Sequence, residues 1–278
     1  MASVAAVTSA NVSRRMSMIP PRTCANLASR FRLATDVSIN GRGKRSQADA
    51  FARAMADIAT KGLKLAIEAE RRIEPGGNLR AAWEELLKAS RRCRRCDLYR
   101  FATQTVFGEG PLDATIMFVG EQPGDQEDLA GRPFVGPAGA LFDKALEKAG
   151  IDRNTVYVTN AVKHFKFVLR GKRRIHDKPD AGEITACRWW IDQERELIRP
   201  PLTVALGATA ARSLVGKTVT ISKVRDAPLT LADGGECWVT AHPSSILRAP
   251  DEDARREAKR LFLRDLKRIG KRAERLAR

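Results

Sequence analysis

The stretch RGKRRIHDKP, residues 170–179, places five basic side chains around a single imidazole, His176. Lysine and arginine bind phosphate through their charge, and that task needs no imidazole. A neutral imidazole held next to an electrophile is instead a nucleophile or a general base. The stretch is therefore a candidate loop that both binds a polyanion and reacts with it. The alternative is a purely electrostatic loop whose histidine is a bystander.

A second candidate is VGEQPGDQED, residues 119–128, which places Gln122, Asp125 and Asp128 on a Pro-Gly turn after an apolar run. Glycine lets a ligand approach the backbone closely, and free amides at such a turn can bind an anion or the edge of a base. The alternative is an ordinary turn between a strand and a helix, with capping carboxylates.

Two further residues suit the binding of a base. Phe134 lies in the Gly- and Pro-rich stretch 131–142, where its ring can stack on a base extruded from DNA or simply anchor the loop. Asn160 ends another apolar run, and its amide offers the donor and the acceptor that match the edge of a pyrimidine. Asn at such a place is also a common helix N-cap.

The stretch HPSSILR, residues 242–248, ends a fourth apolar run with the imidazole of His242. A histidine at the end of a strand can stabilise a developing anion. The pair Leu247 and Arg248 suits the gap that a flipped base leaves in the stack. Taken alone, a histidine such as His242 is more often a hydrogen-bonded structural residue.

Three cysteines have the spacing of a metal site. Cys93 and Cys96 form a Cys-x-x-Cys pair, and Cys187 is a distant third thiol. Iron–sulfur clusters and structural zinc sites usually take four protein ligands. Three ligands are evident in the sequence and the fourth is not.

These candidates need elements that bring them together. Four apolar runs rich in strand formers alternate with stretches of helical spacing. The strand candidates are 114–122, 155–162, 202–207 and 236–243, and the helix candidates are 79–90, 136–150, 187–198, 208–216 and 251–277. The alternation predicts an α/β fold, a three-layer αβα sandwich with a central four-stranded parallel sheet. Ligands of such sheets bind at the carboxyl ends of the strands, so the polar residues that follow three of the strands are expected to converge.

Composition divides the chain into three parts. Residues 1–46 hold eight Lys or Arg and one acidic residue. This composition predicts a basic, disordered arm, and it is also typical of an organelle transit peptide. Residues 47–78 are expected to form a helical extension and a linker, and residues 79–278 a single domain that ends in a basic helix.

The formal net charge of +17 and the pI of 10.2 predict a polyanionic partner. Charge alone does not separate DNA, RNA and an anionic membrane surface. No apolar run approaches about 18 residues, so no membrane span is predicted. The five cysteines are an odd and sparse set, which argues against a disulfide framework and for a reducing compartment, the cytoplasm.

In this order and spacing, the motifs resemble those of the uracil-DNA glycosylase superfamily, close to the iron–sulfur family 4 enzymes and nearest to the UdgX branch. GEQPGDQED followed by GRPFVGPAG matches the first family motif, HPSSILR matches the second, and TNAVKHFKF lies between them. KRRIH is the element that looks like UdgX, since its relatives lack that loop. The resemblance covers residues 80 to about 268.

The resemblance implies a role for each motif residue. Phe134 would stack on a flipped uracil, Asn160 would read its edge, and His242 would support the charge that builds at O2. Gln122 and Asp125 would line the site near the sugar and a water. His176 would become covalently joined to C1′ of the sugar. The residues expected to bind the substrate are Gly120, Glu121, Phe134, Asn160, Ser244, Arg248, Lys172, Arg173 and Arg174. The implied partner is uracil-containing DNA, expected to be single-stranded and to be bound by a monomer.

The implied chemistry is physically consistent. Breaking the N-glycosidic bond produces an oxocarbenium-like sugar and a uracil anion. Fixed donors stabilise the anion, and an imidazole held next to C1′ has a high effective molarity and competes with water for the cation. Two alternatives stay open: an ordinary glycosylase that releases uracil and turns over, and a non-catalytic reader of uracil in DNA.

The resemblance also implies a [4Fe-4S] cluster on Cys93, Cys96 and Cys187, which would hold the first helix of the domain against the helix that carries the third cysteine. Relatives carry a fourth cysteine at or near the third core strand, where this chain reads RPPLTVALG. Cys237 and Cys24 are not obvious substitutes. A cluster with a non-cysteine or displaced ligand, a labile cluster and no cluster all stay open.

Overall fold

A computed structural model of the chain describes residues 78–276. The basic arm and all but the last residue of the extension lie outside this range, so the predictions for them stay predictions. Within the range, no helix combines the length and the apolar character that a membrane crossing requires.

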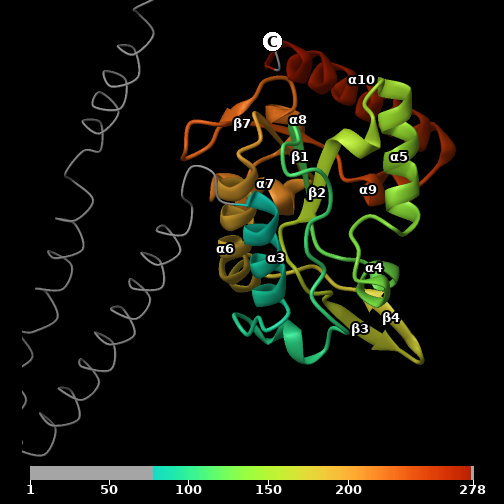
Figure 1. The fold of residues 1–278 in the computed structure, drawn as a ribbon. Coiled ribbons are helices and arrows are strands. Elements are labelled where there is room, and N and C mark those ends of the chain that lie inside the picture. The colour runs from blue at the N-terminus through green and yellow to red at the C-terminus, as the bar shows by residue number, and fades with distance from the viewer. Residues whose placement is uncertain (1–77, 277–278) are drawn as a thin grey trace, which may run out of the picture. The chain divides into compact units, whose positions relative to one another are not determined.

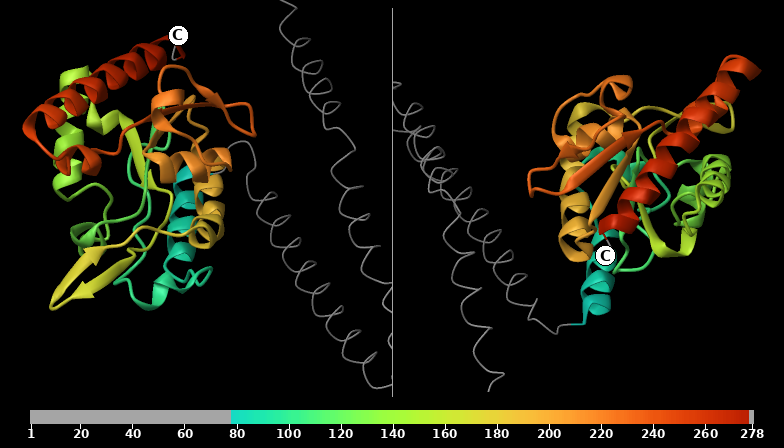
Figure 2. Two further views of the ribbon diagram at one scale, coloured as in Figure 1. Left: turned by 180° about the vertical axis from the view of Figure 1, so that it is seen from behind. Right: turned by 90° about the horizontal axis from the view of Figure 1, so that it is seen from above.

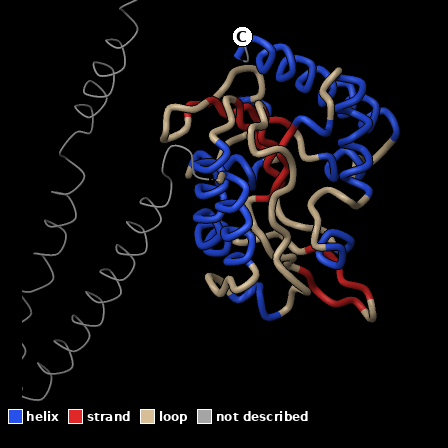
Figure 3. The backbone as a smooth tube through the Cα atoms, in the orientation of Figure 1, coloured by secondary structure: helices blue, strands red, loops and turns tan. Residues whose placement is uncertain are grey.

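The centre of the domain is a five-stranded sheet (Figure 3). Its strands, in spatial order, are β2 (Val156–Asn160), β1 (Ile116–Gly120), β5 (Leu202–Leu206), β7 (Glu236–Thr240) and β6 (Leu229–Thr230). The first four are parallel, and β6 is antiparallel to β7. The predicted fold class and the four parallel strands are confirmed. The edge strand β6 was not predicted, because a strand of two residues is too short to show an alternation of polar and apolar side chains.

The strands are apolar throughout because both faces of the sheet are covered. Along β1, Ile116 and Phe118 point into one core, and Met117 and Val119 point into the other. The first core is closed by α5 (Pro137–Ala149), α9 (Pro243–Leu247) and α10 (Glu252–Leu276). The second is closed by α6 (Ala181–Ile198), α7 (Ala208–Val215) and α8 (Ile221–Val224). α3 (Leu79–Ser90) packs on α6 (Figures 1 and 2).

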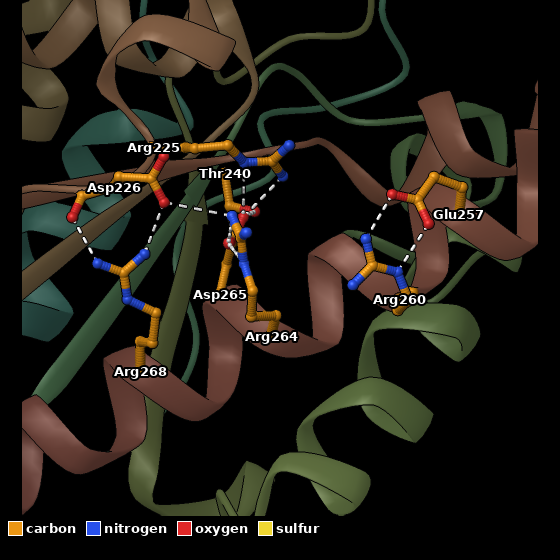
Figure 4. A network of polar contacts seen from close by, with 8 residues as sticks. All are labelled: Arg225, Asp226, Thr240, Glu257, Arg260, Arg264, Asp265 and Arg268. Carbon is orange, nitrogen blue, oxygen red and sulfur yellow. Dashed lines mark hydrogen bonds and ion pairs between the residues drawn. The ribbon is translucent and has the colours of Figure 1, made fainter.

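Polar contacts fix the long basic helix α10 to the end of β7 (Figure 4). The carboxylate of Asp265 is buried; it accepts a hydrogen bond of 2.7 Å from the hydroxyl of Thr240 and pairs at 2.7 Å with Arg225, the residue after α8. A buried carboxylate is stable only with such partners. The network therefore holds the carboxyl end of β7, two residues before the predicted catalytic histidine.

The basic stretch forms the turn and the second strand of a hairpin rather than a loop throughout, so that part of the sequence prediction is wrong. β3 (Phe167–Arg170) and β4 (Arg173–His176) form an antiparallel hairpin in which Phe167 lies opposite His176. The turn between them uses Gly171 with φ of 60°, a left-handed conformation that glycine adopts without strain. The strand is hard to predict from the sequence, because three of its four residues are basic or histidine and no alternation of polar and apolar residues marks it.

The helix predicted over 187–198 begins earlier, at the first residue of α6. Asp180 is its N-cap and accepts from the backbone N–H of Glu183, whose carboxylate accepts from the N–H of Asp180 in return. This reciprocal capping box starts the helix six residues ahead of its apolar period.

Candidate functional site

A pocket of about 610 Å³ opens at the carboxyl ends of the parallel strands, as predicted for this fold. Every predicted catalytic or substrate-binding residue except Gly120 lines it. These residues are Glu121, Gln122, Asp125, Phe134, Asn160, Lys172, Arg173, Arg174, His176, His242, Ser244 and Arg248. The fold therefore brings the sequence motifs together around one pocket.

The floor of the pocket is where β1 and β2 end side by side, since Gly120 pairs with Asn160. A Cβ on Gly120 would lie 2.2 Å from the Oδ1 of Asn160 and 2.8 Å from the ring of Phe134, so only glycine fits. Asn160 is buried, begins no helix, and its Nδ2 has no hydrogen-bond partner among residues 78–276. Because an unpaired buried donor is unfavourable, the floor suits a ligand that brings a carbonyl oxygen.

The ring of Phe134 forms one wall of the pocket. Its backbone is left-handed, with φ of 58°, which residues with a side chain rarely adopt. The ring packs 5.3 Å from Phe142 and is stacked at 6.3 Å with His242, measured between centroids. Gly139 makes room for this turn, since a Cβ there would lie 1.7 Å from the carbonyl oxygen of Phe134. Phe134 thus anchors the loop in the core and also lines the pocket.

The imidazole of His242 is oriented by the helix that it caps. Its Nδ1 accepts from the backbone N–H of Ser244 at 3.2 Å and lies 2.8 Å from the hydroxyl of the same residue. Since Nδ1 accepts, the proton of the neutral ring is on Nε2, which is left to donate. Burial lowers the pKa of His242 to about 4, although the nearby Glu121 opposes this shift. At neutral pH the residue is therefore a neutral hydrogen-bond donor.

Arg174 ties the hairpin to α4 (Asp125–Ala130) rather than facing solvent. Its guanidinium donates to the carboxylates of Asp125 and of the buried Asp128, each at 2.6 Å. It also lies over the rings of Phe165 and Phe167, at 5.5 and 5.2 Å from their centroids. These contacts occupy the planar donor fork of the arginine. Arg174 is thus placed as a clamp for the hairpin and not as a phosphate ligand.

Gln122 fastens the base of the same hairpin. Its Nε2 donates to the carbonyl oxygens of Lys166, at 3.1 Å, and of Asp177, at 2.9 Å. Its Oε1 accepts from the backbone N–H of Lys166 at 3.1 Å. Both amide hydrogens and the carbonyl are engaged, so the geometry makes Gln122 a positioning residue beside the pocket.

His176 shares a face of β4 with Arg174, because side chains alternate along a strand. Its Nε2 lies 3.3 Å from Oε1 of Glu121, and the other carboxylate oxygen of Glu121 accepts from the hydroxyl of Thr209 at 2.5 Å. Burial would raise the pKa of Glu121, but the hydrogen bonds from His176 and Thr209 outweigh it and lower that pKa to about 2. Glu121 is therefore ionised and fixes the imidazole at the pocket wall.

Cations form the rim of the pocket. Lys172 and Arg173 project from the hairpin turn, and Arg248 follows α9; all three are exposed. Leu247, next to Arg248, is also exposed. The rim thus offers charge for phosphates and one apolar side chain at the edge.

The cysteines gather between α3, the short helix η2 (Asp97–Arg100) and α6, in a small apolar cluster with Trp190. Nε1 of Trp190 donates to the sulfur of Cys93, and the backbone N–H of Lys163 donates to the sulfur of Cys187, each at 3.2 Å. Burial raises the pKa of the Cys187 thiol to about 12. A thiolate there requires a positive neighbour such as iron.

The remaining cysteines do not complete the set. Cys237 lies in the core beneath α7, a different cluster from that of the three cysteines. Cys24 lies outside the described residues. Within 78–276, no three side chains of His, Cys, Asp or Glu are arranged to hold a single metal ion.

His164 is a donor that the sequence analysis missed. It is buried, and its Nδ1 has no hydrogen-bond partner in the described part of the chain. It follows Lys163, whose amide contacts Cys187. Burial lowers the pKa of His164 to about 4, and Arg94, next to Cys93 in the chain, adds to this effect. The sequence could have pointed to His164 as a functional residue, because the chain has three histidines and the other two lie in the pocket.

A wholly buried ion pair lies behind the pocket floor. Nζ of Lys163 is 2.5 Å from the carboxylate of Glu194, and it also donates to the hydroxyl of Thr159 at 2.6 Å and to the carbonyl of Asn160 at 2.9 Å. The hydroxyl of Tyr157 donates to Glu194 at 3.0 Å. These bonds fix the end of β2. The sequence analysis did not predict this pair, because a single charged residue forms no repeating pattern from which its burial could be inferred.

The fold and the pocket define an α/β protein with a cavity at the carboxyl ends of its parallel strands, beneath a cationic rim. The family model of the uracil DNA glycosylase superfamily matches residues 107–267, and the chain belongs to this superfamily. The type-4 uracil-DNA glycosylase of Thermotoga maritima is 41% identical over 167 residues, 60% of this chain and 83% of the relative. That of Archaeoglobus fulgidus is 32% identical over 194 residues, 67% of this chain and 91% of the relative. The resemblance is confirmed for the superfamily, and the UdgX branch stays a prediction.

Proposed function

We propose that this protein excises uracil from DNA and that His176 then traps the sugar in a covalent adduct. The excision is supported by the superfamily and by relatives named as type-4 uracil-DNA glycosylases. The observation that carries the trap is the imidazole of His176, held at the pocket wall by Glu121 at 3.3 Å. A bystander histidine on a solvated hairpin would need no such partner.

Base recognition falls to the floor and the wall of the pocket. Nδ2 of Asn160 donates to a carbonyl oxygen of uracil, and the base stacks on Phe134. A Cβ at residue 120 would block this place, which is why Gly120 belongs to the site. Lys172, Arg173 and Arg248 bind the flanking phosphates, since they are exposed at the rim.

The chemical step breaks the bond between C1′ and the uracil nitrogen, and the electron pair leaves with the base. Nε2 of His242 donates to the oxygen on which the negative charge builds, in the manner of a fixed neutral electrophile. A lone pair of the His176 ring then forms the bond to C1′. The ring becomes positively charged in this step, and the carboxylate of Glu121 stabilises it.

We also propose that the three cysteines hold a [4Fe-4S] cluster, with His164 as the fourth ligand. The donor set fits the group, because His164, whose buried Nδ1 has no partner among the described residues, directly follows Lys163, whose backbone N–H donates to the sulfur of Cys187. When bound, the cluster would supply a structural link. Cys93 and Cys96 would be tied to Cys187, which fixes the segment after α3 against α6.

A denaturing gel of the protein with a uracil-containing single-stranded oligonucleotide tests the function. A slow band that resists heat and SDS is expected for the natural chain and is expected to vanish in His176→Ala, which should still release uracil. Free uracil without an adduct from the natural chain would leave a turnover glycosylase. If the protein binds the oligonucleotide but forms neither the adduct nor free uracil, it is a non-catalytic reader of uracil in DNA. His242→Gln serves as the control that should lower the release of uracil.

A further inference from the structure

A second basic region lies outside the pocket, around the first two cysteines. We name it the arginine–aromatic surface and define it as the side chains of Arg94, Arg95, Tyr99, Arg100, Phe101 and Trp189. Phe101 is 68% exposed and Trp189 is 38% exposed. Single exposed apolar side chains are common, but aromatic rings that gather on one surface mark an interaction site.

The surface carries a strong positive charge. The stretch RRCRRCDLYRF, residues 91–101, holds five arginines and one acidic residue, Asp97. Asp97 pairs with Arg100 at 3.1 Å. No carboxylate among residues 78–276 forms an ion pair with the other four arginines. This charge is complementary to a polyanion.

The rings and the cations are already stacked on one another. The guanidinium of Arg94 lies 4.2 Å from the centroid of the Tyr99 ring, and that of Arg95 lies 4.4 Å from a ring of Trp189. Trp189 in turn meets the buried Trp190 edge-on, with centroids 4.6 Å apart, so the core supports it from below. A stacked guanidinium keeps its N–H donors at its edge, where they can reach phosphate.

The surface adjoins the pocket. The chain after Phe101 runs along α4: the N–H of Thr103 donates to the carboxylate of Asp128 at 3.0 Å, and Nε2 of Gln104 donates to the carbonyl of Asp128 at 3.0 Å. α4 lines the pocket through residues that include Asp125. η2 and the β3–β4 hairpin lie at the same end of the domain (Figures 1 and 2). A DNA strand that leaves the pocket past α4 therefore reaches this surface.

We propose that the arginine–aromatic surface is a second binding site, which holds single-stranded DNA next to the pocket. Bases stack on the exposed ring of Phe101, and Arg94 and Arg95, which lie over the rings of Tyr99 and Trp189, bind the phosphates. Paired bases are already stacked on each other, so exposed rings favour a single strand. An acidic protein segment would pair with the arginines but would not need the exposed aromatic rings, so DNA fits this surface better. This proposal rests on the proposed function only for the position of the uracil pocket. Binding of DNA at the arginine–aromatic surface itself needs no uracil.

Fluorescence anisotropy of the full-length protein with a uracil-free oligothymidylate of about 15 nucleotides tests the surface. Phe101→Ala is expected to weaken binding about tenfold, since the stacking of one base on an aromatic ring contributes about that factor. Arg95→Ala is expected to lower the slope of log K against log salt by about 0.7. Leu79→Ala and Lys217→Ala are the controls. They are exposed residues at the start of α3 and after the end of α7, at the opposite end of the sheet, and should bind like the natural chain.

Equal affinity of the natural chain and Phe101→Ala for oligothymidylate would overturn the proposal. An equally large effect of Phe101→Ala on a duplex of the same length would overturn it too, since the ring cannot stack on paired bases. Uracil release measured on the same samples keeps the two proposals apart. If the natural chain releases no uracil, the proposed function is refuted. If Phe101→Ala nevertheless lowers the affinity for oligothymidylate, the second binding site is still supported.

Discussion

Replacing Arg174 by alanine removes the clamp that holds the β3–β4 hairpin over the pocket. The variant loses a hydrogen bond of 2.6 Å to the buried carboxylate of Asp128 and another of 2.6 Å to the more exposed Asp125. A bond between a charged donor and a buried carboxylate contributes about 1.5–3 kcal/mol, and an exposed ion pair contributes less than about 1 kcal/mol. We therefore expect the free energy of unfolding to fall by about 2–4 kcal/mol.

The loss should affect trapping more than excision. His176 is on the clamped strand, and a displacement of about 1 Å from an attacking position reduces a rate about 100-fold. Asn160 and His242 are on other elements, whose contacts do not involve Arg174. The ratio of covalent adduct to released uracil is therefore expected to fall about 100-fold, while uracil is still released.

Single-turnover reactions at a temperature well below unfolding measure both products, the adduct on a denaturing gel and the free uracil by chromatography. Arg170→Ala is the matched control. It removes an exposed cation of the same hairpin that does not line the pocket, so stability should stay within about 0.5 kcal/mol and the product ratio should not change. An Arg174→Ala variant that keeps the natural product ratio, or that loses both products in proportion, would refute the reasoning.

Three further measurements test other parts of the site. Lys163→Met should lower the free energy of unfolding in urea by about 3–5 kcal/mol, because it leaves Glu194 buried without its cation, and Glu194→Gln in the same chain should recover much of the loss. His164→Ala should lower the iron content and the absorbance at about 400 nm, whereas His164→Cys should keep both; equal iron in all three chains would exclude His164 as a ligand. The ring of His242, assigned by NMR against His242→Gln, should protonate only as the pH falls to about 4, so the residue should remain a neutral donor down to about pH 5. A midpoint near 6.5 would contradict its burial.

The strands and the residues of the pocket can be predicted from the sequence, because both depend on rules of local pattern and topology. β1 is a continuous apolar run, which is what a strand covered on both faces requires. Asn160 and His242 each follow such a run, and parallel strands bring their carboxyl ends to one edge. Their convergence in one pocket follows without knowledge of any contact.

The partners of the polar side chains could not be predicted in the same way. Three consecutive residues, Lys172 to Arg174, are basic, and the register of the hairpin decides which of them faces α4. A shift by one residue would exchange the two faces of β4. The same holds for Gln122, whose amide is engaged by two backbone segments 11 residues apart that only the hairpin brings together, Lys166 and Asp177. Pattern thus predicts the residues of the site but not which of them hold the others in place.

The stretch TNAVKHFK, residues 159–166, connects the pocket with the cysteine site. Asn160, near its start, lies on the pocket floor. Lys163 donates through Nζ to the carbonyl of Asn160 at 2.9 Å and through its backbone N–H to the sulfur of Cys187 at 3.2 Å. His164 follows directly. A displacement at the cysteines therefore reaches Asn160 through one residue, without any transfer of electrons. A group bound there should influence uracil affinity through the position of Asn160, and its removal should weaken binding before it slows the chemical step.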